Sequence, residues 1–187
     1  GYDDSWVKEA ESRGLLNLKT TPDALPYFKT EENIELFERQ KVLSKEEVQS
    51  RYEILMDEYE KQINIEALTM LDIAKKDILP AASKFSKELT DTIANKKAIG
   101  IDLTYELETA KKISEYLTEA YQALITLEKD VEKLHSIDDF EKSAFYVRDF
   151  IIQDMAALRK PCDELEVVTS NEAWPFPTYG KLLFGIL

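Results

Sequence analysis

The sequence contains very little of the residues that usually build metal sites and nucleophilic active sites. Its 187 residues include one cysteine and one histidine. The single cysteine, Cys162, cannot form a disulfide within the chain. A single histidine also excludes the paired histidine motifs of carboxylate-bridged di-iron bundles. These two absences leave few routes to metal or thiol chemistry.

Glycine, proline and basic residues are also scarce. Five glycines, six prolines and a charged fraction of 33% favour an ordered chain dominated by helices. Lysine and arginine number 24 against 37 aspartates and glutamates, and the formal net charge is −13. Because such a charge repels phosphate backbones and anionic lipid, we expect no nucleic-acid partner and no membrane partner.

Long apolar runs are missing as well. No run approaches the roughly 18 apolar residues that a membrane helix requires, and no N-terminal stretch resembles a signal peptide. We therefore expect a cytoplasmic protein. The length of 187 residues fits one domain, or one domain with an appendage.

Residues 1–43 predict three short helices. Gly14 should end the first, Thr21-Pro22 should begin the second, and Thr30 should precede a third that reaches about residue 40. The apolar residues of this segment follow no clean period, and we interpret the segment as one that packs against something larger. Its candidate docking residues are Leu25, Tyr27 and Phe28.

A very long amphipathic helix is predicted from Ser44 onward. Ser44-Lys-Glu-Glu47 has the pattern of a capping box, and apolar residues then recur every three or four positions to about residue 97. Pro80 should produce a kink near residues 76–79. The predicted apolar row consists of Val48, Tyr52, Leu55, Tyr59, Ile63, Ala67, Met70, Ala74, Ile78, Ala81, Phe85, Leu89 and Ile93.

Two further long helices should follow. Gly100 should end the first long helix, and Asp102 or Thr104 should begin the next. The last helix should run from Phe140, with Pro161 expected to bend it or end it early. In the helix between these two, apolar residues recur alternately every three and four positions, which is the a/d seam of a coiled coil. The seam consists of Ala110, Ile113, Leu117, Ala120, Leu124, Leu127, Val131 and Leu134.

These patterns predict an all-α fold. We expect a long antiparallel three-helix bundle over residues 44–187, preceded by the short helices, because turns of a few residues join antiparallel neighbours. The first long helix is longer than either later helix can cover. Part of it must then contact another helix, the N-terminal segment or another chain.

The C-terminal residues 169–187 should form an extended docking tail. Pro175 and Pro177 restrict the backbone, and they place Trp174, Phe176 and Tyr179 along its path. Because so much apolar surface rarely stays in water, the tail should either fold back onto its own subunit or dock on a neighbouring one.

One short motif resembles those of catalytic metal sites. Glu132-Lys-Leu-His135 is an E-x-x-H pattern, but di-iron sites need two of them. Since Leu134 belongs to the seam, His135 should lie at the end of its helix, where the dipole favours an imidazolium. Cys162 should be a small buried residue. With no phosphate loop or nucleophile motif, we predict no catalytic, cofactor-binding or metal-ligating residue.

Three stretches of the sequence carry a specific resemblance. They read NLKTTPDALPYF at residues 17–28, INIEALTM followed by AKKDILPA at residues 63–81, and WPFPTYG at residues 174–180. Together they resemble the C-terminal region of type III glutamine synthetases, the large-subunit bacterial class. The resemblance spans nearly the whole chain and is weaker across the charged helices.

The resemblance implies an enzyme that joins ammonia to glutamate using ATP and Mg²⁺ or Mn²⁺. It places the catalytic residues on a core upstream of Gly1, so we expect this chain to be an inactive fragment. The absence of an initiator Met suits that expectation. Residues 1–43 would pack on the upstream catalytic domain, and the long helices would assemble or stabilise a homo-oligomer. The alternative is a stand-alone helical adaptor whose partner surface is the seam from Ala110 to Leu134.

Overall fold

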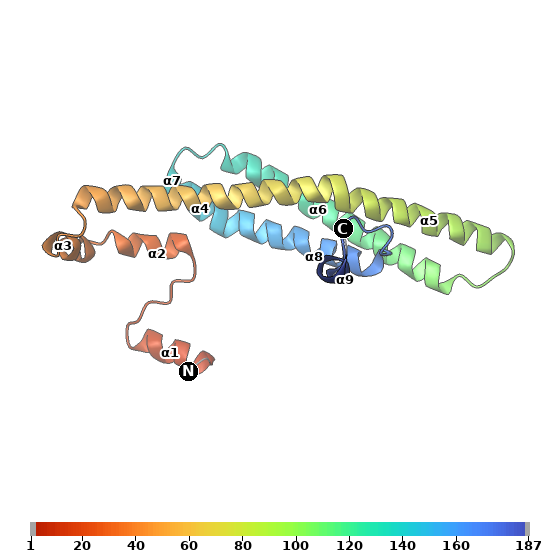
Figure 1. Cartoon of the computed structure of the whole chain (residues 1–187), viewed down its shortest axis with the longest axis horizontal. Helices are drawn as coiled ribbons and strands as arrows, with labels where there is room; N and C mark the ends of the chain where they lie inside the picture. Colours follow the sequence, from red (N-terminus) through yellow and green to blue (C-terminus); the bar gives the residue numbers. More distant parts are fainter. Residues whose placement is uncertain (1–2, 186–187) are drawn as a thin grey trace. The chain divides into compact units, whose positions relative to one another are not determined.

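The computed structural model describes residues 3–185, and these residues form helices without a β-strand (Figure 1). The prediction of an all-α fold is confirmed. The last two residues of the predicted tail lie outside the described residues. The helices are α1 Asp4–Ser12, α2 Thr21–Phe28, α3 Glu31–Arg39, α4 Lys45–Ile73, the π-helical η1 Ala74–Ile78, α5 Leu79–Ala98, α6 Thr104–Leu134, α7 Phe140–Tyr146, the π-helical η2 Val147–Ile151, α8 Ile152–Val168 and α9 Tyr179–Phe184.

The helix ends follow the predicted local signals. Gly14 has a positive φ of 79°, which ends the turn after α1 at little steric cost. At the start of α4 the capping box forms as predicted. The Ser44 N–H donates to the Glu47 carboxylate at 2.7 Å, and the Glu47 N–H donates to Ser44 Oγ at 3.3 Å. These two bonds satisfy amide groups that have no partner within the helix.

A π-helical turn, η1, precedes Pro80 at the place of the predicted kink. In η1 the Leu79 N–H donates to the Ala74 carbonyl, five residues back. Pro80 follows immediately, and it has no N–H to continue the regular ladder. The wider turn accommodates the proline ring, so α4, η1 and α5 follow one another without a loop.

The last helix and the tail differ in part from the prediction. Of the two outcomes predicted for Pro161, a bend or an early end of the helix, the early end is wrong, because α8 continues through Pro161 to Val168. Pro161 is buried together with its neighbours Leu158 and Cys162, and this packing outweighs the missing hydrogen bond. The tail is not extended throughout, because Thr178 accepts a hydrogen bond from the Lys181 N–H at 3.3 Å and caps the short helix α9.

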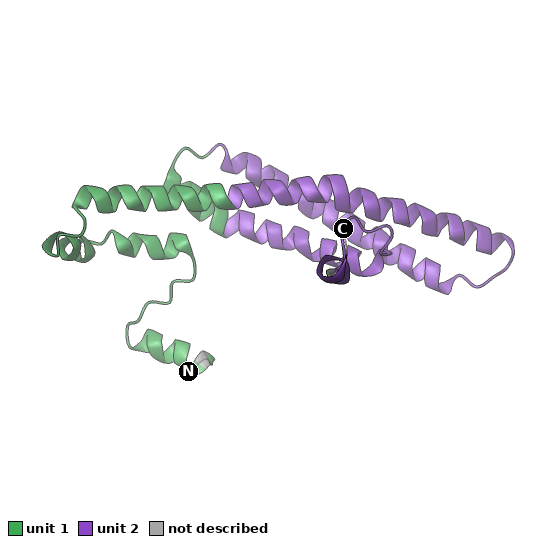
Figure 2. Ribbon diagram, in the orientation of Figure 1, with its two compact units in different colours: residues 1–62, 137–148 green, residues 63–136, 149–187 purple. Residues whose placement is uncertain are grey.

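The chain divides into two compact units (Figure 2). The first comprises residues 1–62 and 137–148, and the second comprises residues 63–136 and 149–187. In the first unit, Tyr52, Met56 and Ala144 form a buried cluster. In the second unit, α6 packs against both α5 and α8, and α8 also packs against η1.

The first unit shows how the N-terminal part of α4 is covered. Leu25 and Phe28 of α2 pack on the cluster, together with aromatic residues of α7. Met56 is fully buried, whereas the predicted Leu55 is 41% exposed. The predicted row was therefore one position off at this point, because α2 and α7 determine which face of α4 is buried.

Candidate docking elements

The three predicted docking residues of α2 differ in their exposure to solvent. Leu25 and Phe28 pack against the buried cluster of their own unit, and Phe28 also contacts the Phe37 ring at a centroid distance of 5.5 Å. Tyr27 is 44% exposed. Leu25 and Phe28 thus attach α2 to this unit, and Tyr27 remains available on its surface.

Glu141 connects α2, α4 and α7 through polar contacts. Its Oε1 accepts a hydrogen bond from Tyr52 Oη at 2.6 Å and one from Lys29 Nζ at 2.8 Å. The Lys29 ammonium also lies 3.7 Å from the centre of the Tyr52 ring. The hydrogen bond from Lys29 is the main reason that the pKa of Glu141 is lowered. Burial, followed by the bond to Glu141, raises the pKa of Tyr52.

A second ion pair attaches α2 to the end of the first unit. The Arg148 guanidinium pairs with Asp23, and its carbon atom lies 4.7 Å from the centre of the Phe145 ring. Both Asp23 and Lys29 are in or next to the N-terminal motif. Sequence reasoning missed their partners, which lie more than 100 residues further along the chain and show no local signal.

The aromatic tail residues line a pocket in the second unit. The Trp174 and Phe176 rings meet edge to face at 6.2 Å and 71°. With Ile78 of η1 and Cys162 of α8 they line a cavity of about 360 Å³. Trp174 Nε1 is buried and has no hydrogen-bond partner among the described residues. Tyr179 begins α9, but its side chain lies outside the described part of the structure.

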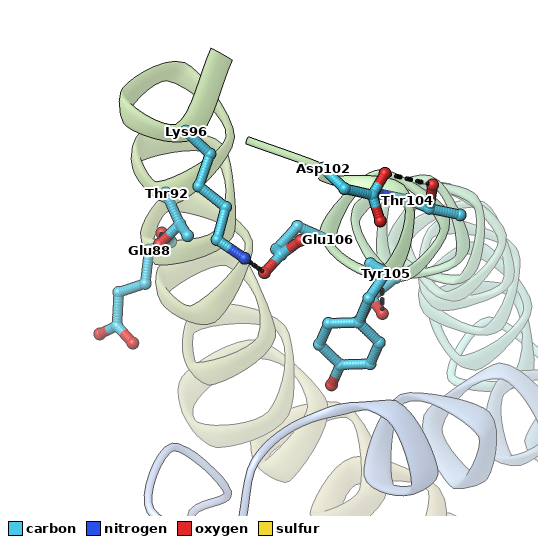
Figure 3. Close-up of polar contacts among 8 residues, drawn as sticks. Glu88, Thr92, Lys96, Asp102, Thr104, Tyr105 and Glu106 are labelled. Atoms are coloured by element: carbon cyan, nitrogen blue, oxygen red, sulfur yellow. Dashed lines mark hydrogen bonds and ion pairs between the residues drawn. The ribbon is translucent and has the colours of Figure 1, made fainter. Parts of the chain in front are cut away.

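The turn between α5 and α6 is held by polar contacts (Figure 3). Lys96 of α5 pairs with the buried Glu106 of α6, and the hydrogen bond from Lys96 is the main reason that the pKa of Glu106 is lowered. Asp102 Oδ1 accepts a hydrogen bond from Thr104 Oγ1 at 2.9 Å. Gly100 supplies the positive φ of 72° that the turn requires. These contacts keep α5 and α6 together at the turn.

The predicted seam of α6 is internal. Ile113, Leu124 and Leu127 are buried, and the helix packs against α5 and α8. An adaptor that used this seam as its partner surface would have to expose the core of the second unit. The adaptor alternative is therefore wrong in that form.

The remaining candidate residues show ordinary packing. Glu132 and His135 are exposed, and His135 Nε2 lies 3.2 Å from Asn64 Oδ1. Among the side chains that the structure describes, no group of three His, Cys, Asp or Glu residues could hold a metal ion. The prediction that Cys162 is buried is confirmed, and burial raises the pKa of its thiol to about 11.

Asp154 of α8 is the most perturbed carboxyl group of the second unit. Its Oδ2 is buried and has no hydrogen-bond partner in the described structure. Burial, a hydrogen bond with Asp130 of α6 and the charge of Asp130 raise the pKa of Asp154 to about 6. Two carboxyl groups this close favour a shared proton over two negative charges.

The Asp154 carboxyl should make stability depend on pH. The pKa of Asp154 in the folded chain is about 6, which is above the unfolded value of about 3.9. The stabilisation that this carboxyl group contributes is therefore complete below pH 4 and is lost as the pH rises through 6. We expect a loss of about 1 kcal/mol, since partial exposure weakens the effect. In urea titrations at pH 4 and 7, Asp154→Asn should remove this part of the difference in the free energy of unfolding between the two pH values. The exposed control Asp77→Asn should keep it, and equal behaviour of both variants would contradict the assignment.

Comparisons with known proteins identify the family of this chain. The family model described as the glutamine synthetase C-terminal domain matches residues 1–97. A glutamine synthetase of Butyrivibrio fibrisolvens is 38% identical over all of this chain and 27% of that protein. A type-3 glutamine synthetase of Dictyostelium discoideum is 32% identical over 98% of this chain and 26% of that protein. For a glutamine synthetase of Bacteroides fragilis the identity is 25%, over 98% of this chain and 26% of that protein.

The described residues form an all-α fold of long helices, and large apolar side chains are exposed near both ends of the chain. The chain belongs to the glutamine synthetase C-terminal domain family. It spans about a quarter of the length of the curated relatives it matches. None of the helices formed by the described residues has the length and apolar character needed to span a bilayer.

Proposed function

We propose that this chain is the helical C-terminal domain of a glutamate–ammonia ligase, which joins ammonia to glutamate at the expense of ATP. The supporting observation is that its similarity to glutamine synthetases extends over at least 98% of the chain. ATP and Mg²⁺ or Mn²⁺ would then bind to residues outside this chain, in a cytoplasmic enzyme. The chain alone would carry out no reaction.

An activity assay on the native polypeptide tests this proposal. An antibody raised against the 21.6 kDa chain captures that polypeptide from cells, and the captured material is assayed for ATP-dependent conversion of glutamate and ammonia to glutamine. We expect activity on a polypeptide about four times as long and none with the 187-residue chain. An inactive polypeptide of about 21.6 kDa would contradict the proposal.

Residues 1–43 are proposed to attach this domain to the upstream catalytic domain. Leu25 and Phe28 are already used inside the first unit, so the attachment must involve other apolar residues of the same segment. Large apolar side chains that remain exposed close together are typical of an interaction surface. The exposed large apolar residues of this segment are Trp6, Val7, Leu15, Leu16, Tyr27, Leu36 and Val42.

The long helices are proposed to strengthen a homo-oligomer. Because α2 and α7 cover one face of α4 within the first unit, the excess length of this helix no longer requires a second chain there. The proposal is supported instead by Ile54 and Leu55, two exposed apolar residues in the part of α4 that belongs to the first unit. They line a surface hollow of about 650 Å³ with Glu46, Glu47 and Glu58 among its other residues.

Charge insertion in the whole enzyme tests the assembly role. The double change Ile54→Asp and Leu55→Asp should reduce the mass of the oligomer by at least half in light scattering, because it places two charges in an apolar contact. Val167→Asp, at an exposed site of α8, is the matched control and should leave the mass unchanged. An unchanged mass in the double variant would exclude this face of α4 from the assembly, whatever the activity assay shows.

A further inference from the structure

An apolar groove in the second unit lacks a complete cover. It runs between α8 and residues 65–78 of α4 and η1, and its cavity volume is about 530 Å³. Most of its lining is apolar, and Ile65 and Ile73 remain exposed to solvent. Its main apolar lining residues are Ile65, Met70, Ile73, Ile78, Met155 and Leu158.

The C-terminal tail already lies at one end of this groove. The groove and the neighbouring cavity of about 360 Å³ share Ile78, Cys162 and Asp163. The opposite wall of the smaller cavity consists of tail residues, including Trp174 and Leu182. The groove is therefore continuous with the surface on which the tail rests.

The end of the tail exposes the kind of surface that such a groove would bury. Leu182, Leu183 and Phe184 of α9 are 65%, 71% and 84% exposed. Lys181 is the one charged residue of α9, and its charge is opposite to those of Asp163 and Glu166, which line the smaller cavity. Both the apolar lining of the groove and these charges suit this segment.

We propose that the groove between α8 and residues 65–78 is the docking site of this chain's own C-terminal end. Leu183 and Phe184 enter it past Cys162, and Lys181 stays near the acidic residues at the rim. Docking removes apolar surface of both partners from water. The groove and the tail both belong to the second unit. The proposed docking therefore holds whether or not the whole polypeptide catalyses the ligase reaction.

Cross-linking in the full-length protein tests the docking directly. In a Cys162→Ala background, Thr69→Cys within the groove is combined with Phe184→Cys and treated with a short bis-maleimide. The control combines Phe184→Cys with Leu68→Cys, which is exposed and lies next to Thr69 but outside the groove lining. The Phe184→Cys single variant gives the background reaction.

We expect the groove pair to react at least about tenfold faster than the control pair, and its product to keep the mass of one polypeptide. Equal rates in the two pairs would overturn the proposal. A product with the mass of two polypeptides would overturn it as well, because the groove would then hold the tail of a second copy.

Binding of the neutral dye Nile red gives an independent measurement. Phe184→Asp should release the tail, because a charge in the groove would be desolvated, and dye fluorescence should rise at least about twofold. Val167→Asp places the same charge on exposed α8 surface outside both cavities and should leave the fluorescence unchanged. The same fluorescence in both variants would contradict docking.

Discussion

Replacement of Leu127 by alanine should lower the free energy of unfolding by about 2 to 5 kcal/mol. Leu127 is fully buried in α6, and α6 is the one long helix of the second unit that packs against both α5 and α8. Truncation removes buried apolar surface and leaves a cavity that the neighbouring helices can close only in part. The change can be measured by urea unfolding of the 187-residue chain, followed by circular dichroism at 222 nm.

Leu107→Ala is the matched control for this experiment. Leu107 lies on the same helix and is 38% exposed, so its truncation should cost less than about 1 kcal/mol, since much of its surface is already in water. A similar loss in both variants would show that the buried position of Leu127 is not what stabilises the helix. The expected contrast therefore tests the packing of α6 and not only helix propensity.

The second large effect is expected at Tyr52 in the first unit. Tyr52 is almost fully buried, and its ring packs edge to face with Phe140 at 6.0 Å. Tyr52→Ala should cost about 3 to 5 kcal/mol because it removes an aromatic ring from the core. Tyr52→Phe should cost about 1 kcal/mol, since it removes only the hydrogen bond to Glu141.

Tryptic cleavage after Lys29 provides a local measurement of the same prediction. Lys29 pairs with Glu141 and lies against the Tyr52 ring, so Tyr52→Ala should release α2 and speed cleavage there, whereas Tyr52→Phe should have a small effect. Tyr105→Ala, at an exposed residue of α6, is the control. If Tyr52→Phe were as damaging as Tyr52→Ala, the hydroxyl rather than the ring would be the main contribution.

The family likeness and the local structure could both be predicted from the sequence. The capping box at Ser44 and the turn at Gly100 depend on residues a few positions apart. Such interactions are encoded by local spacing. Burial of Cys162 and of the seam in α6 also followed from apolar periodicity. The three quoted motifs pointed to the family that the comparisons establish.

The candidate docking elements could be only partly predicted. Leu25, Tyr27 and Phe28 lie next to one another in sequence, yet two of them pack inside the first unit and Tyr27 is exposed. Their assignment depends on where α2 meets α4 and α7. No pattern within the motif contains that information, because the ion-pair partners of Asp23 and Lys29 are Arg148 and Glu141.

The sequence by itself therefore determined the all-α class, most helix boundaries and the family. Only the tertiary structure decided that Met56 rather than Leu55 is buried, that α8 continues through Pro161, and that the tail forms α9 and lines the smaller cavity. The physical reason is the range of the interactions. Caps and periodicity act within a few residues, whereas burial depends on which surfaces of distant segments meet.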